Sequence, residues 1–119
     1  MSDQFQNAVL DDQALISGLK SINETWGDLT VRVAGEVWGM PLIDQKTKAL
    51  ITIAIDQMAL NVTGDGNPFG AHVDMALKQG ATYEEIEELI VFASAYTGFN
   101  KGATTMGALN KVRHDRGDI

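Results

Sequence analysis

The chain has 119 residues, of which 45% are hydrophobic, and a net charge of −7 from 16 acidic and 9 basic side chains. This length predicts one domain over residues 1–119, and the acidic balance disfavours nucleic acid and anionic membranes as partners. Because the chain has no cysteine, disulfides, thiolate nucleophiles and thiolate metal ligands are excluded.

The N-terminal residues lack the basic segment followed by an apolar one that marks a secretory signal. Residues 1–10 are expected to fray or to lie over a partner. The first helix is predicted from Asp12 or the residue before it to Gly27, with an apolar stripe on one face. That stripe consists of Leu15, Leu19 and Ile22.

A second helix is predicted to begin near Asp28 and to be stopped by Gly39 and Pro41, because proline cannot continue a helix. A third is predicted over residues 44–61, with Asp44 as its N-cap. The buried stripe predicted for this third helix is Leu50, Ile53, Ala54 and Met58.

The third helix also carries apolar residues away from its main stripe, namely Ile51, Ile55 and Leu60. A monomer of this size cannot easily bury apolar side chains around a whole helix. The sequence therefore predicts a homo-oligomer. The apolar run "ALITIAIDQMAL" is interrupted by polar residues and is too short to span a bilayer, so a cytoplasmic protein with no membrane partner is expected.

Three further helices are predicted in the second half of the chain. Asn67 is placed as an N-cap with Pro68 in the first helical position, where a missing N–H costs little. Thr82 and Glu85 have capping-box spacing and begin the next helix, and the last covers residues 100–113. No segment alternates apolar and polar residues as a strand does, so the fold is predicted to be all-α with about six helices.

His72 lies in the first turn of the helix that follows the glycine-rich segment "GDGNPFG". The free N–H groups of a helix N-terminus attract anions, and an imidazole beside them is suited to proton transfer with a carboxylated substrate. The same pattern also suits a structural histidine that hydrogen-bonds a neighbouring helix. A lone histidine by itself favours this second interpretation.

A carboxylate that orients His72 must come from another helix, because Asp74 is two positions away and points elsewhere. Glu36 is the candidate, because it lies in an otherwise apolar helix, and burial of a carboxylate is unfavourable unless it has a partner. Alternatively, Glu36 faces solvent or pairs with Lys46 or Lys48.

Other site chemistries are poorly matched by the sequence. Two histidines, one of them near the C-terminus, and no cysteine give no recognised metal-ligand spacing. The sequence lacks a P-loop, a dinucleotide fingerprint and a nucleophile elbow. No cofactor or metal is therefore expected.

Two ordered segments, "GEVWGMPLIDQKTKALITIA" and "HVDMALKQGATYEEIEELIVFASAYTGF", resemble the carboxymuconolactone decarboxylase family. The resemblance covers roughly residues 30–110. It implies an alkylhydroperoxidase-D-like helical fold that assembles as a trimer or a hexamer. The thiol-redox branch of this superfamily uses C-x-x-C-x-x-x-H, whose thiol positions fall on Asp65 and Pro68 here. Thiol peroxidase activity is therefore excluded.

The remaining branch implies a cofactor-independent decarboxylase, in which a carboxylated lactone loses CO2 and the resulting dienolate is reprotonated. His72 matches the family histidine and would transfer the proton, with Glu36 orienting it or sharing the proton. Lys48, or the N-terminus of the helix that holds His72, would bind the carboxylate. The residues expected to form an apolar wall are Trp38, Phe69 and Tyr96.

The chain departs from the family pattern near this site. The connection "NVTGDGNPFG" is longer, Asp74 stands where an arginine is common, and Asn100 replaces a usual proline. These changes suggest a different and less charged small-molecule substrate. The alternative function is a non-catalytic oligomeric scaffold or small-molecule binding protein that has lost the chemistry.

Overall fold

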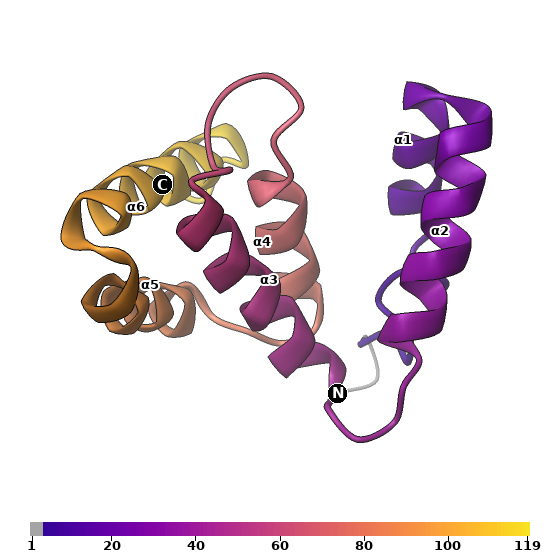
Figure 1. Cartoon of the computed structure of the whole chain (residues 1–119), viewed down its shortest axis with the longest axis horizontal. Coiled ribbons are helices and arrows are strands. Elements are labelled where there is room, and N and C mark those ends of the chain that lie inside the picture. The colour runs from indigo at the N-terminus through magenta and orange to yellow at the C-terminus, as the bar shows by residue number, and fades with distance from the viewer. Residues whose placement is uncertain (1–3) are drawn as a thin grey trace.

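A computed structural model describes residues 4–119 and shows six helices, with no strand among those residues (Figure 1). In chain order they are α1 (Gln13–Ile22), α2 (Glu24–Trp38), α3 (Gln45–Ala59), α4 (Phe69–Lys78), α5 (Tyr83–Thr97) and α6 (Phe99–Asp115). The all-α prediction is confirmed. Within the same residues, no helix is both long enough and apolar enough to cross a membrane.

Two predicted helix starts are confirmed at the level of individual hydrogen bonds. The Asp44 side chain accepts a hydrogen bond from the backbone N–H of Thr47 at 2.8 Å and caps α3. Thr82 and Glu85 form both halves of the capping box that begins α5. Each device satisfies backbone N–H groups that the first turn of a helix leaves free.

The boundary between the first two helices lies earlier than predicted. α1 ends at Ile22, and Asn23 caps α2 by accepting a hydrogen bond from the N–H of Trp26 at 2.9 Å. Gly27 therefore does not end the first helix but lies inside the second. A Cβ atom at Gly27 would be 2.6 Å from the Cα of Lys20, so this glycine lets the two helices touch backbone to backbone.

Helix α3 packs against α4, α5 and α6, whereas α1 and α2 pack chiefly against each other. Figure 1 shows this α1–α2 hairpin standing beside the other four helices. The buried face of α3 consists of Ala49, Ile53, Asp56 and Gln57. Met58 is exposed, so the predicted stripe was wrong at that position, because the face toward the other helices is rotated to include Asp56 and Gln57.

The segment before α1 is packed onto the protein rather than frayed. Ala8 and Val9 are buried, and the N–H of Ala8 donates to Oε1 of Gln45 at 2.7 Å. The same Gln45 side chain donates to the carbonyl oxygen of Trp38 at 2.6 Å. Gln45 therefore ties the N-terminal segment and the end of α2 to the start of α3. For residues 1–3, the prediction of fraying lies outside the described residues.

Candidate active site

A cavity of about 500 Å³ lies between the α1–α2 hairpin and α4 with the residues just before it, and His72 is on its wall. Most of the lining is apolar. The hairpin contributes Leu15, Leu19, Ile22, Trp26, Thr30, Ala34 and Trp38, and the other side contributes Asn61, Gly66, Asn67, Pro68, Ala71, His72 and Met75, with Val9 from the N-terminal segment. The predicted stripe of α1 thus faces this cavity.

The start of α4 fixes the position of His72. The helix begins at Phe69, one residue later than predicted, and the Asn67 side chain accepts a hydrogen bond from the N–H of Phe69 at 3.0 Å. The N–H of His72 then donates to the carbonyl oxygen of Pro68 at 3.0 Å. Asn67 and Pro68 therefore define the first turn that presents the imidazole to the cavity.

Asp56 on α3 is the carboxylate that contacts His72. Its Oδ2 lies 2.6 Å from Nδ1 of the imidazole, with the Asp56 side chain 5% exposed and the His72 side chain 24% exposed. A carboxylate can only accept a hydrogen bond, so the proton of this contact lies on Nδ1. The second ring nitrogen, Nε2, is then the one left for a ligand.

The prediction that Glu36 orients His72 is not met in the structure. Glu36 is exposed, whereas the cavity face of α2 is formed by residues four apart, from Trp26 to Trp38. Glu36 lies two residues from Ala34 and from Trp38, and a two-residue step turns a side chain about 200° around a helix. It therefore points away from the cavity.

Lys48 binds the end of α2 and does not line the His72 cavity. Its Nζ donates to the carbonyl oxygens of Trp38 at 2.8 Å and of Met40 at 2.6 Å. A cation at a helix C-terminus satisfies carbonyl groups that have no partner within the helix. Lys48 therefore caps the C-terminus of α2, whereas the sequence had predicted that it would bind a substrate carboxylate.

The three predicted wall residues lie in different environments. Trp38 lines the cavity together with His72. Phe69 is buried and lines a neighbouring hollow between residues 62–67 and α6. Tyr96 is 78% exposed on α5, with its ring 5.5 Å from that of Phe92. The structure therefore brings Trp38 and His72 together and leaves the other two outside this cavity.

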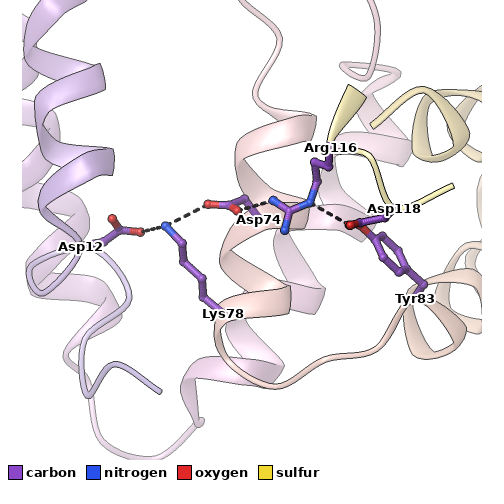
Figure 2. A network of polar contacts seen from close by, with 6 residues as sticks. All are labelled: Asp12, Asp74, Lys78, Tyr83, Arg116 and Asp118. Carbon is purple, nitrogen blue, oxygen red and sulfur yellow. Dashed lines mark hydrogen bonds and ion pairs between the residues drawn. The ribbon is translucent and has the colours of Figure 1, made fainter. Parts of the chain in front are cut away.

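A network of ion pairs joins the N-cap of α1, helix α4 and the residues that follow α6 (Figure 2). Lys78 lies 2.9 Å from Asp12 and 3.0 Å from Asp74, and Arg116 lies 2.6 Å from the other oxygen of Asp74. Arg116 also pairs with Asp118. The negative charge of Asp74, which the sequence placed near the site, is thus neutralised by two cations.

Asp56 was missed by sequence reasoning, although a signal for it was present. It interrupts the apolar run "ALITIAIDQMAL" and follows Ala49 and Ile53 at helical spacing on the buried face of α3. A carboxylate on a buried face needs a partner, and that argument was applied to Glu36 instead. Across the described residues, no group of three or more His, Cys, Asp or Glu side chains is placed to hold a metal ion.

Comparison with known proteins relates this arrangement to a family. A model of the carboxymuconolactone decarboxylase family matches residues 25–111, a range that contains Asp56 and His72. The 4-carboxymuconolactone decarboxylase of Acinetobacter baylyi is 29% identical over 103 residues, which cover 86% of this chain and 74% of that protein. No solved structure gives a significant match.

Proposed function

The chain belongs to the carboxymuconolactone decarboxylase family, and we propose that it is a cofactor-independent decarboxylase acting on a lactone or an enolisable carboxylic acid. The observation that carries this proposal is the contact between the imidazole of His72 and the buried carboxylate of Asp56 on the wall of an apolar cavity. His72 is the proton-transfer residue, and Asp56 is the residue that positions it.

The proposed reaction needs one proton and no external electron source. The C–C bond to the substrate carboxylate breaks, CO2 leaves, and the bonding electron pair passes through the conjugated double bond to the lactone carbonyl. The resulting dienolate then takes a proton from Nε2 of the His72 imidazolium, which forms a C–H bond. Solvent returns the proton to His72, so one carboxylate and one proton become CO2 and the C–H product.

Asp56 supports both protonation states of His72 in this sequence. Its contact with Nδ1 holds the ring in one orientation, so that Nε2 stays available for the substrate. When the imidazole gains its second proton, the adjacent carboxylate stabilises the positive charge. Trp38 supplies part of the apolar wall, which favours a reaction that removes charge from the substrate.

We also propose that the chain assembles as a homo-oligomer, either a trimer or a hexamer. Large apolar side chains that are exposed in the single chain support this proposal. On α3 they are Ile51, Ile55 and Met58, and on α5 and the start of α6 they are Val91, Phe92, Tyr96 and Phe99. Exposed apolar surface of this extent is typical of a protein interface.

The test of the proposed function is turnover of carboxymuconolactone and related carboxylated lactones, followed by ultraviolet absorbance, with His72→Ala beside the wild type. An enzyme loses turnover in His72→Ala while its assembly is unchanged. A structural histidine would instead lose stability or assembly. Absence of turnover of every lactone by an assembled wild type would favour the small-molecule binding protein.

A further inference from the structure

The strongest feature of the His72 cavity is its lack of charge. Its lining consists of nine apolar side chains, of Gly66 and Pro68 just before α4, and of the polar residues Thr30, Asn61, Asn67 and His72. Within residues 4–119, the lining includes no lysine, arginine, aspartate or glutamate. A protonated His72 is the one cation that the wall itself can present.

Three cations of the fold, Lys48, Lys78 and Arg116, are held by other groups. Lys48 is bound by the carbonyl oxygens at the end of α2, and Lys78 is held between Asp12 and Asp74. Arg116 is held by Asp74 and Asp118 (Figure 2). None of the three lines the cavity, and each would have to leave a partner to reach a ligand there.

We infer that this cavity selects a substrate whose only charge is the carboxylate that the reaction removes, with an apolar remainder. The inference rests on the proposed function. A single carboxylate can face a protonated His72 and lose its charge as CO2, so its burial is temporary. A second carboxylate would meet no cation in the lining besides His72, only the neutral side chains of Thr30, Asn61 and Asn67. Burial of a charge without an opposite charge is strongly unfavourable.

The shape of the wall supports an apolar ring or branched alkyl substituent on the substrate. Trp26, Thr30, Ala34 and Trp38 are spaced four residues apart on α2 and form one continuous strip opposite the start of α4. A volume of about 500 Å³ falls within the usual range for small-molecule sites. A five-membered lactone with one such substituent therefore fits both the size and the polarity of the cavity.

Two matched furanone carboxylates test this inference. Both retain the leaving carboxylate; one has an isobutyl arm, and the other has the carboxymethyl arm of carboxymuconolactone, so the second carries one more negative charge at similar size. Their saturated forms lack the double bond that accepts the electron pair, so calorimetry on the wild-type oligomer measures binding without turnover. We expect the isobutyl compound to bind at least about tenfold more tightly, which corresponds to about 1.4 kcal/mol.

A pair of variants tests whether charge is the cause. Thr30→Lys introduces a cation on the cavity strip and is expected to reduce or reverse the preference, whereas Thr30→Met adds similar length without charge and should keep it. Equal or tighter binding of the carboxymethyl compound by the wild type would overturn the inference, and so would failure of both compounds to bind.

Turnover of the unsaturated pair separates this inference from the proposed function. If the isobutyl compound binds preferentially but is not decarboxylated, the selectivity stands and the decarboxylase proposal fails. If carboxymuconolactone is bound and decarboxylated as well as the isobutyl compound, the proposed function stands and the inference on substrate charge fails.

Discussion

Lys78 on α4 lies 2.9 Å from the carboxylate of Asp12, which is itself the N-cap of α1. The Asp12 side chain is 4% exposed, so this ion pair is one of the contacts that hold the hairpin wall of the cavity against the four-helix body. Asp12 uses its second oxygen to accept the N–H of Leu15 at 3.1 Å. The Asp12 carboxylate thus caps the first turn of α1 and also binds α1 to α4 through Lys78.

This ion pair makes stability depend on pH in the alkaline range. The hydrogen bond to Asp12, helped by Asp74, raises the pKa of Lys78 above its ordinary value of 10.5. The folded protein therefore binds this proton more tightly than the unfolded chain. Its contribution is fully present below pH 10.5 and is lost as the pH rises through the folded pKa. Burial also raises the pKa of the Tyr83 hydroxyl, so its deprotonation at alkaline pH destabilises the folded protein as well.

We expect the free energy of unfolding, measured with urea, to fall for the wild type as the pH rises above 10.5. Lys78→Met should give a lower free energy near neutral pH and a shallower fall. Lys111→Met is the control, because it removes an ion pair between two exposed side chains and such pairs contribute little. A wild-type slope unchanged in Lys78→Met would contradict the assignment.

The contact between Asp56 and His72 predicts a large difference between two carboxylate variants. Asp56→Asn is expected to lower kcat by about 100-fold or more, because an amide neither fixes the proton on Nδ1 nor stabilises the imidazolium. Glu36→Gln should have a much smaller effect, since Glu36 is exposed and points away from the cavity. The measurement is kcat and kcat/KM across pH for both variants.

Comparable losses in the two variants would contradict the assignment of the orienting role to Asp56 alone. The assembly of each variant, measured by light scattering, separates a loss of turnover from a loss of the oligomer. Asp56→Asn is also expected to change the shape of the pH profile, a readout that a purely structural role for Asp56 would leave unmoved.

Two glycines of α6 should respond in opposite directions to the same substitution. A Cβ atom at Gly102 would lie 1.9 Å from Oγ and 2.9 Å from Cβ of Ser94, so Gly102→Ala must push α5 and α6 apart. We expect it to lower the free energy of unfolding by about 1–3 kcal/mol. At Gly107 a Cβ meets open space, so Gly107→Ala should raise stability by about 0.5–1 kcal/mol.

Urea unfolding of the two variants gives both values under identical conditions. Because Gly102 and Gly107 lie in one helix, the change in helix propensity is the same, and the difference reports the α5–α6 contact. Equal effects of the two substitutions would show that this close approach does not limit the packing.

The proposed homo-oligomer predicts that a charge on α5 disrupts assembly. Phe92 is 65% exposed and its ring lies against Tyr96, so Phe92→Glu should reduce the mass measured by light scattering while leaving the helical circular dichroism intact. Glu88→Gln, one turn earlier on the same face of α5, removes a charge instead of adding one and should not reduce the mass. A wild type that is monomeric at micromolar concentration would refute the assembly.

Local signals in the sequence were sufficient for most of the helices. The caps formed by Asp44 and by the pair Thr82 and Glu85 act within three residues of the chain, and such contacts form in the same way whatever surrounds them. The boundary between α1 and α2 was missed because the helical pattern continues past Asn23. Gly27 was interpreted as the end of a helix, whereas it is the point at which the two helices approach closely.

The site itself was decided by tertiary packing. The sequence alone predicted His72 as a site residue, a carboxylate from another helix beside it, and Trp38 as part of the wall; the structure places His72 and Trp38 on one cavity. Only the packing of α3 against α4 chose Asp56 over Glu36, because it fixed which face of each helix turns inward. Periodicity gives the faces of a helix but not its rotation against a neighbour, and that rotation is set by how all the buried side chains fit together.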